Sequence, residues 1–346
     1  MKFRYLGKSG LLVSELALGT MTFGAPGWGC DAKEAHRIIA AYLEAGGNMI
    51  DAADVYAKGD TESIIGAYMP NIKRDDLILA SKCNFPLGNG PNALGSSRKH
   101  IVESVEASLR RLKTDYIDIY YLHRADPLVP VEEIAETFDI LIGQGKILYA
   151  ACSNLPAWRI MLDNAAAKAR RSAGFVCGQY LYNLVDRSCE QEIIPAMVHE
   201  GIGFLCWSPL AGGMLAGKYD VTTEVPKGSR ADLRRSLDIP RFWTEKGRQV
   251  AGEFLKIAKE LDVAPAKLAV SWLLSRDFVS SVLLGARTVE QLSVSLGATD
   301  YELPAEVKAR LDAVSEPAKN YLWSFNEETN EQFRARGKAF PGSIIC

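Results

Sequence analysis

Short apolar runs alternate with amphipathic segments along most of this chain. The runs lack strict apolar–polar alternation, which is typical of strands that are covered on both faces. The segments between them have helical spacing: within 97–113, Val102, Val105, Leu109 and Leu112 fall on one face. Strands that alternate with helices of this length indicate parallel βα units.

Eight such units can be counted, starting with the run 16–20. The second strand ends at Asp51, and the others are expected at 77–83, 116–123, 147–152, 175–180, 203–207 and 280–284. Helices are expected at 31–45, 61–69, 97–113, 131–143, 156–171, 188–200, 243–262, 265–275 and 288–297. A long loop is expected at 208–240.

Two of these helices begin with a recognisable capping pattern. Asp31 precedes Glu34 by three residues, and Ser188 precedes Gln191 by three. A side-chain oxygen at such a position can accept a hydrogen bond from a free N–H of the first helical turn. We therefore expect Asp31 and Ser188 to cap the helices that run to about residues 45 and 200.

The length of 346 residues fits one barrel with extra loops, so we expect a single α/β domain over 1–346, a (β/α)8 TIM barrel. An open doubly wound sheet is the alternative, but no glycine-rich fingerprint follows the first strand, which favours the closed barrel. Residues 1–14 are expected to form an N-terminal β-hairpin over the bottom of the barrel. Residues 304–346 form a C-terminal tail over or beside the pocket, where Tyr321, Trp323 and Phe325 either cover the pocket mouth or pack on the outside.

Charge and cysteine usage exclude several classes of protein. With 40 basic and 42 acidic side chains, the net charge of -2 gives no support to nucleic acid or an anionic membrane as a partner. The seven cysteines lack metal-type pairing, and no H-x-H or H-E-x-x-H occurs, so no metal is expected. An odd cysteine count without a secretory signal favours the cytoplasm. The uncharged stretch 201–217 is too short and too rich in glycine to span a membrane.

Three consecutive strands each end on an ionisable group: Asp51, Lys82 and His123, with Tyr56 shortly after the first. In a parallel barrel these ends converge on one pocket. An ammonium beside a tyrosine favours the phenolate and lowers the phenol pKa, while a carboxylate keeps that ammonium charged. A histidine can hold a carbonyl oxygen by a hydrogen bond. Together the four groups form a general acid suited to hydride delivery to a carbonyl carbon.

One further segment resembles a phosphate-binding loop. The segment from Gly212 to Lys218 matches most of the phosphate-binding pattern G-x-x-x-x-G-K, but Tyr219 stands where a serine or threonine would bind magnesium. We interpret it as a flexible glycine loop.

At these residues the chain resembles the aldo-keto reductase superfamily, and its branch of bacterial general-stress reductases and potassium-channel β subunits. The resemblance runs from Leu16 to about Ala298. It rests on a set of short stretches: 16–20, Asp51 with Ala53, Tyr56, Gly59 and Glu62, then 81–82, 118–124, 145–147, 153–154, 207–219 and 285–292.

The resemblance implies NADPH as cofactor and a carbonyl substrate. It makes Tyr56 the acid, with Lys82 and Asp51 tuning it and His123 orienting the substrate. Arg287 is expected to meet the 2′-phosphate and so to favour NADPH over NADH. The cofactor-binding residues implied are Gly19, Thr20, Met21, Asp51, Ser153, Asn154, Gln179, Trp207, Ser208, Pro209, Leu210, Ala211, Gly212, Lys218, Arg230, Gly285, Arg287, Gln291 and Ser295.

Two positions depart from the family pattern. Ala52 replaces the usual threonine, and Ser295 stands where this branch commonly has an asparagine that contacts adenine. The loop 220–242 has no family pattern and is expected to shape the substrate pocket together with Trp28, Arg124 and Trp243.

The function expected is therefore NADPH-dependent reduction of an aldehyde or ketone to an alcohol, reversibly, by a cytoplasmic enzyme that acts on a small molecule. One alternative is an NADP-binding regulatory subunit with slow turnover. Another is a barrel lyase or isomerase without a nicotinamide. The oligomeric state, the direction in the cell and the physiological substrate stay open.

Overall fold

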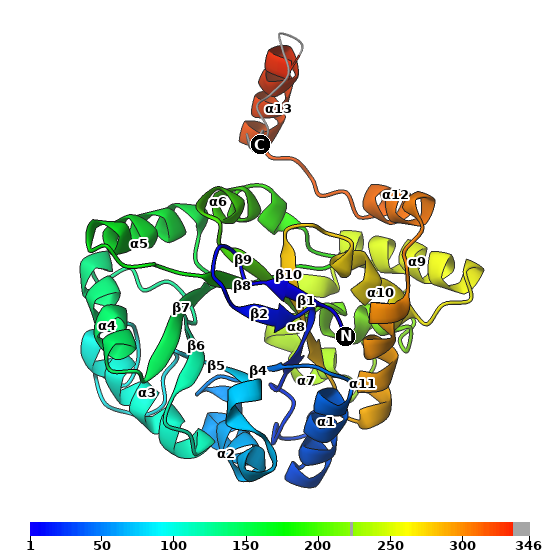
Figure 1. Ribbon diagram of the computed structural model, residues 1–346. Coiled ribbons are helices and arrows are strands. Elements are labelled where there is room, and N and C mark those ends of the chain that lie inside the picture. Colours follow the sequence, from blue (N-terminus) through cyan, green and yellow to red (C-terminus); the bar gives the residue numbers. More distant parts are fainter. Residues whose placement is uncertain (222–223, 335–346) are drawn as a thin grey trace.

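Eight parallel strands close into a barrel in the computed structural model, which describes residues 1–221 and 224–334 (Figure 1). The last strand of the barrel pairs with the first, so the sheet has no free edge. The predicted (β/α)8 barrel is confirmed. Its strands are β3 (Leu16–Gly19), β4 (Met49–Asp51), β5 (Ile78–Cys83), β6 (Ile117–Leu122), β7 (Ile147–Ser153), β8 (Cys177–Leu181), β9 (Gly203–Trp207) and β10 (Val279–Gly285).

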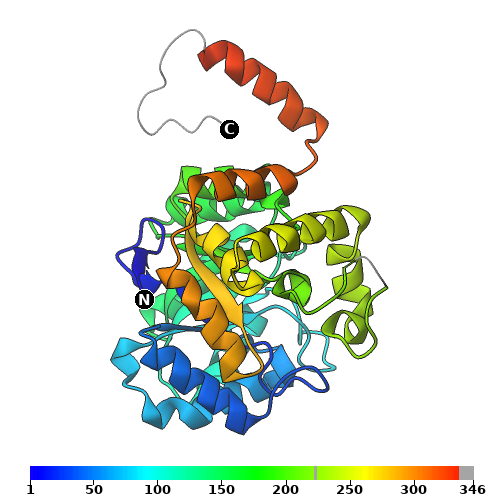
Figure 2. The same cartoon turned by 90° about the vertical axis from the view of Figure 1, so that its right-hand side faces the viewer.

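Helices surround the barrel on all sides (Figures 1 and 2). Side chains cap several of them: Asp31 accepts a hydrogen bond from Glu34 N, Ser97 from His100 N, Thr244 from Gly247 N and Thr288 from Gln291 N. The helices after the strands are α1 (Ala32–Glu44), α2 (Asp60–Tyr68), α3 (Arg98–Leu112), α4 (Val131–Gly143), α5 (Ala157–Ala169), α6 (Ile193–Glu200), α9 (Glu245–Glu260), α10 (Pro265–Leu274) and α11 (Val289–Leu296).

The cap predicted at Ser188 is wrong. Its hydroxyl donates to Asp186 Oδ1, and only a single 3₁₀ turn, Ser188–Glu190, follows. Helix α6 begins later, at Ile193. The N–H of Gln191, which the side chain was expected to cap, donates instead to the carbonyl oxygen of Ser188, so a 3₁₀ turn forms here and not the first turn of an α-helix.

Two cores hold the barrel together. A small one fills the interior, where Ala17, Met49, Tyr121 and Leu205 point inward. A much larger one lies between the strands and the helices. The hairpin of β1 (Phe3–Tyr5) and β2 (Leu12–Ser14) contributes the buried residues Leu6 and Val13 to the interior core. It therefore closes one end of the barrel and leaves the other end for a site.

The long loop predicted at 208–240 is only partly irregular. It contains the 3₁₀ segment Ala211–Ala216 and the helices α7 (Arg230–Leu233) and α8 (Arg235–Phe242). Helix α8 contains Pro240, the residue at which the loop was expected to end. The buried side chains of Asp238 and Phe242 anchor this helix to the barrel.

The tail continues as α12 (Ala305–Val314) and α13 (Tyr321–Arg334). Helix α12 packs on the barrel through Val307 and Leu311. Helix α13 projects away from the barrel beyond α12 in both views (Figures 1 and 2). Tyr321 and Phe325 are exposed and contact each other, with ring centroids 5.8 Å apart.

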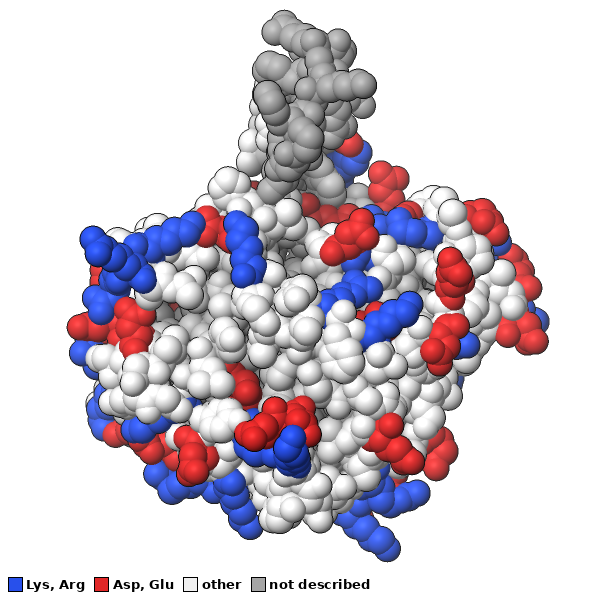
Figure 3. Space-filling model, viewed as in Figure 1, with Lys and Arg blue, Asp and Glu red and all other residues white. Residues whose placement is uncertain are grey.

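The surface agrees with the balanced composition. Acidic and basic side chains both occur around the rim of the face in Figure 3. Among the described residues, no helix is both long and apolar enough to cross a membrane, and no cluster of side chains with metal-binding potential is found.

Candidate active site

Four side chains meet at the carboxyl end of the barrel: Asp51 of β4, Tyr56 of the turn after β4, Lys82 of β5, and His123, which directly follows β6. Lys82 Nζ donates to Asp51 Oδ2 at 2.6 Å and to the carbonyl oxygen of Ala52 at 2.6 Å. It also lies 3.4 Å from the hydroxyl of Tyr56. The ring of His123 faces the ring of Tyr56 edge-on, with centroids 6.1 Å apart. The structure thus brings the four predicted residues together.

Burial dominates the electrostatics of this group. The side chains of Lys82 and Asp51 are 0% and 1% exposed. Burial raises the pKa of Asp51, although the charge of Lys82 opposes this. Burial alone would lower the pKa of Lys82, but Asp51 beside it raises that pKa above its ordinary value. The ammonium is therefore held charged in the barrel interior.

The charge of Lys82 lowers the pKa of Tyr56, as the sequence predicted, but the net direction of the shift is upward. Burial raises that pKa, and the charge of Lys82 offsets only part of the effect. The phenol consequently stays protonated at neutral pH. That state suits a group that must hold a proton until charge develops on a neighbouring oxygen.

His123 is neutral in this setting. Burial and then the charges of Lys82 and Arg124 lower its pKa well below the ordinary value. Its Nδ1 is buried and has no hydrogen-bond partner among the described residues. The ring packs edge-on against Phe85 at 4.8 Å. A neutral imidazole can donate a hydrogen bond to a substrate oxygen without competing with Tyr56 as the proton source.

A tight turn places Tyr56 over the pocket. Ala57 and Lys58 have φ values of 44° and 57°, and Gly59 has φ 98°. A Cβ on Gly59 would come within 3.0 Å of the Arg111 side chain. Glycine at this position allows both the backbone conformation and the close approach of α3.

A chain of hydrogen bonds links the strand ends beside the four groups. Gln179 Nε2 donates to Asp51 Oδ1 at 2.8 Å, and Ser153 Oγ donates to the carbonyl oxygen of Gln179 at 2.7 Å. Asn154 donates to Ser153 Oγ and to the carbonyl oxygen of His123, and it accepts from the Trp207 indole at 3.2 Å. Because the exposed amide of Asn154 is fixed by its neighbours, the rim of the pocket is a preorganised polar surface.

A glycine loop follows β9 at the same end. Backbone φ angles are positive at Ser208, Ala211, Gly212 and Gly213, with values of 59°, 47°, 67° and 99°. Such conformations turn successive backbone N–H groups toward one side, where an anion can be bound. Pro209 and Leu210 lie within this loop, and Lys218 is exposed at its end.

The first and last strands border this loop. Gly19 is the last residue of β3, Thr20 and Met21 follow it, and Thr20 Oγ1 donates to the carbonyl oxygen of Asp51. A Cβ on Gly285 would meet no atom within 4 Å, so the space beside the end of β10 is open. At the start of α11 the backbone N–H of Arg287 donates to Gln291 Oε1, while the guanidinium is exposed. Ser295 is buried, and its hydroxyl donates to the carbonyl oxygen of Gln291 at 3.4 Å.

The three residues predicted for the substrate pocket have different surroundings. The indole of Trp28 lies beneath the guanidiniums of Arg230 and Arg234. Arg124 donates to Asn84 Oδ1 and stacks on Phe85. Trp243 instead packs in the main core beside Tyr219.

The sequence did not single out Asp54, Asn84 or Phe85. Asp54 is fully buried behind the pocket, and both of its carboxylate oxygens lack a hydrogen-bond partner among the described residues. A polar residue right after a strand looks like an exposed loop residue, so no local pattern marks it. Asn84 and Phe85 directly follow β5, and their position after a strand was the one signal that could have found them.

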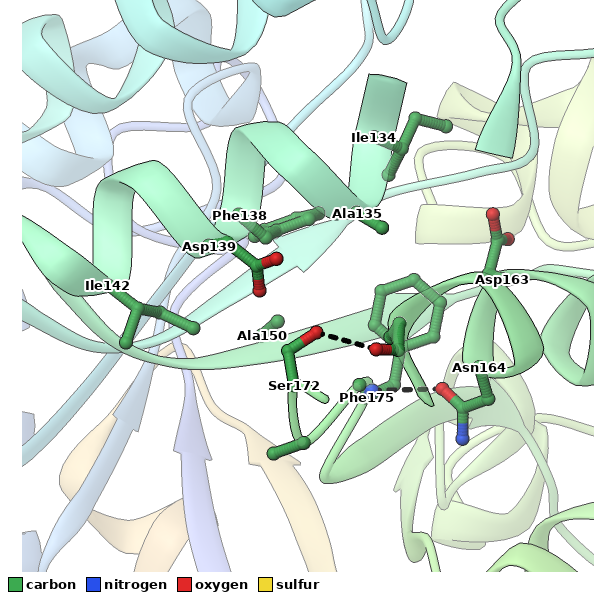
Figure 4. Close-up of a pocket in the computed structure, with 13 residues that line it drawn as sticks. Ile134, Ala135, Phe138, Asp139, Ile142, Ala150, Asp163, Asn164, Ser172 and Phe175 are labelled. Atoms are coloured by element: carbon green, nitrogen blue, oxygen red, sulfur yellow. Dashed lines mark hydrogen bonds between the residues drawn. The ribbon is translucent and has the colours of Figure 1, made fainter. Parts of the chain in front are cut away.

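A hollow between α4 and α5 lies apart from this site (Figure 4). The side chain of Asn164 accepts from the backbone N–H of Phe175 there. Its lining comes from the two helices, from Ala150 in the middle of β7, and from the segment before β8: Ile134, Ala135, Phe138, Asp139, Ile142, Ala150, Asp163, Asn164, Ala167 and 172–175. None of the four convergent groups contributes to it.

Comparison with known proteins gives consistent results. The sequence model of the Aldo/keto reductase family matches residues 15–316. An oxidoreductase of Bacillus subtilis (strain 168), YrpG, is 36% identical over 338 residues, which is 93% of this chain and 100% of that protein. A probable voltage-gated potassium channel subunit beta of rice (Oryza sativa subsp. japonica) is 38% identical over 322 residues, 91% of this chain and 96% of that protein. The corresponding protein of Arabidopsis thaliana is 38% identical over 306 residues, 87% of this chain and 92% of that protein.

Proposed function

Because this chain belongs to the aldo/keto reductase family, we propose that it reduces an aldehyde or ketone to an alcohol with NADPH, and that the same groups serve the reverse reaction. The observation that carries the proposal is the contact of buried Lys82 with both Asp51 and Tyr56. A phenol held beside a fixed ammonium is a proton donor for an oxygen that becomes negative. Reduction of a carbonyl requires such a donor.

The residues around the pocket fit a nicotinamide dinucleotide. The fixed amides of Asn154 and Gln179, with Ser153, offer polar contacts for a carboxamide. The glycine loop after β9 offers backbone N–H groups and Lys218 for a pyrophosphate. The exposed Arg287 offers a guanidinium for a 2′-phosphate. When bound, the nicotinamide would supply the hydride that the carbonyl carbon accepts.

The side chains of the protein bind the carbonyl oxygen of the substrate and protonate it. His123, being neutral, donates a hydrogen bond to the carbonyl oxygen and fixes its position. Tyr56 passes its proton to that oxygen as negative charge develops there. Lys82 stays charged beside Asp51 and stabilises the phenolate that remains. In the reverse direction the phenolate accepts the proton of an alcohol.

A regulatory subunit is the second candidate. It is favoured by the similarity to proteins named as probable potassium-channel β subunits, which extends over most of both chains. Such a protein would bind NADPH tightly and release it slowly. The catalytic group is compatible with this alternative, so the two candidates differ in turnover and not in the residues of the site.

A titration with NADPH and with NADH, followed by nicotinamide fluorescence, tests the proposal when combined with turnover on a panel of aldehydes and ketones. Tighter binding of NADPH with turnover is the expected result. Tight binding without turnover on any carbonyl would favour the regulatory subunit. Failure to bind either nucleotide would overturn both, and would leave a barrel without nicotinamide chemistry.

A further inference from the structure

Two guanidiniums share one indole at the mouth of the pocket. The Cζ atoms of Arg230 and Arg234 lie 5.3 and 5.1 Å from the centroid of the Trp28 ring. Trp28 comes from the loop after β3, while both arginines come from the segment that contains α7 and α8. The stacking therefore joins two loops over the catalytic group, and it fixes the direction of both charged side chains.

The two arginines differ in their partners. Arg230 forms an ion pair with Asp238 at 3.1 Å, and that carboxylate is only 2% exposed. Arg234 forms no ion pair with any described residue. Its polar contact is a weak one, from Nη1 to the sulfur of Met21 at 3.8 Å. A half-buried guanidinium that has five N–H donors and only a thioether acceptor among the described residues is incompletely paired, and an anionic ligand would complete it.

Arg234 also acts on the catalytic group. Its charge is among the influences that lower the pKa of Tyr56 against the larger effect of burial. Its contact atom in Met21 lies just beyond the end of β3, on the rim of the same pocket. A substrate whose carbonyl reaches Tyr56 would therefore pass close to Arg234.

Further positive charge surrounds this position. Arg241 stacks on the Trp207 ring at 5.6 Å, and its charge is among those that lower the pKa of Arg234. Burial and then the charge of Arg230 lower the pKa of Arg234, with Asp238 opposing them. The whole chain is slightly acidic, with a net charge of -2, so this excess of arginine is local. Clefts lined by one sign of charge attract ligands of the opposite sign.

We propose that Arg234 binds an anionic group, a carboxylate or a phosphate monoester, carried by the carbonyl substrate. The proposal rests on the proposed reductase function and names the class of its substrate. Arg230 keeps its ion pair with the buried Asp238. The guanidinium of Arg234 donates two parallel hydrogen bonds to the anion. The carbonyl end of the same molecule lies at Tyr56 and His123.

Matched pairs of substrates test this assignment. In each pair the reacting carbonyl is the same and only the remote charge differs: 4-carboxybenzaldehyde against its methyl ester, and glyceraldehyde 3-phosphate against glyceraldehyde. We expect the wild-type enzyme to prefer the charged member of at least one pair in kcat/KM. Arg234→Met should lower kcat/KM for that member by roughly 10- to 100-fold and lower that of the neutral member by much less. The pair in which the charged member is preferred shows whether Arg234 binds a carboxylate or a phosphate.

Arg235→Met is the matched control, because Arg235 is the next residue, is largely exposed and pairs with Asp232. It should leave every substrate pair unaffected. Arg234→Lys should restore part of the lost preference. The affinity for NADPH, measured by fluorescence, should be the same in all variants. A loss of NADPH affinity in Arg234→Met would assign Arg234 to the cofactor and overturn the proposal.

The test separates this inference from the proposed function. An equal loss on charged and neutral aldehydes, or no loss at all, would remove Arg234 as an anion site while the reductase remains. If the wild-type protein turned over no carbonyl, calorimetric titration of its NADP⁺ complex with 4-(hydroxymethyl)benzoate would still show whether Arg234 binds an anion. Binding that is lost in Arg234→Met supports the site, and binding equal in both proteins, or absent from both, contradicts it.

Discussion

Lys82 Nζ and Asp51 Oδ2 lie 2.6 Å apart, and both side chains are essentially inaccessible to solvent. The two residues come from adjacent strands, β4 and β5, at the point where the strands end. A buried pair of this kind costs desolvation energy, so it is weak evidence for stability by itself. Its value here is that it holds an ammonium charged beside the hydroxyl of Tyr56.

Replacing one partner of this pair should lower the free energy of unfolding more than replacing both partners. We expect Asp51→Asn and Lys82→Met each to lower the free energy of unfolding by about 3 kcal/mol, because one charge is left buried without its partner. The double variant should be more stable than either single variant. Urea unfolding of the four proteins measures the coupling. Asp76→Asn, which removes the exposed ion pair of Lys73, should cost less than about 1 kcal/mol. Strict additivity of the two buried substitutions would contradict the argument.

Tyr56→Phe should remove the acid and little else. The hydroxyl lies 3.4 Å from Lys82 and makes no shorter contact with the described residues. We expect kcat for carbonyl reduction to fall by roughly 100- to 10,000-fold with unchanged NADPH affinity. Tyr5→Phe, on the hairpin at the opposite end of the barrel, is the control and should behave as wild type. Activity retained in Tyr56→Phe would exclude Tyr56 as the proton donor.

The sequence predicted the barrel and the four catalytic candidates because both depend on local order along the chain. Each strand is a short apolar run, and parallel strands bring their ends together, so Asp51, Lys82 and His123 could be placed in one pocket. The stacking of Arg234 on Trp28 could not be predicted in this way. It depends on how two irregular loops, distant in sequence, fold over each other, and neither loop has a periodic pattern.

The missed and incorrect assignments have a common physical origin. Ser188 fits the pattern of a helix cap, but the N–H of Gln191 donates to its carbonyl oxygen and a 3₁₀ turn forms instead. Asp54 looks like a loop residue, but its side chain is fully buried in the folded protein. Lys82 lowers the pKa of Tyr56 as predicted, but burial, which was not part of the sequence argument, raises that pKa overall. In each case a tertiary contact overrides a local preference.

Arg287 should distinguish the two nicotinamide dinucleotides. Its guanidinium is exposed at the start of α11, and its backbone N–H is held by Gln291. We expect Arg287→Ala to weaken NADPH binding by roughly 10- to 100-fold and NADH binding by much less, since only NADPH carries a 2′-phosphate. Fluorescence titration measures both affinities. Arg37→Ala removes an exposed arginine that pairs with Glu34 and should change neither. Equal weakening of both nucleotides would mean that Arg287 does not contact the 2′-phosphate.

Asp54 makes the stability of the fold depend on pH. Burial, and then the nearby charge of Glu62, raise its pKa to about 8. In the unfolded chain an aspartate titrates near its ordinary value of about 3.9. Between these values the folded state binds more protons than the unfolded state, so stability falls as the pH rises. The contribution of Asp54 is fully present below about pH 4 and is lost progressively up to about pH 8.

Asp54→Asn should therefore stabilise the protein at high pH more than at low pH, because the amide does not titrate. We expect the difference in Tm between variant and wild type to grow by roughly 5 °C from about pH 5 to about pH 8. Asp277→Asn, at an exposed position before β10, is the control and should show no such trend. A difference in Tm that stays constant with pH would mean that Asp54 is charged in the folded protein throughout this range. Arg111, which bonds to Glu62 across the same buried cluster, would then be the group that neutralises it.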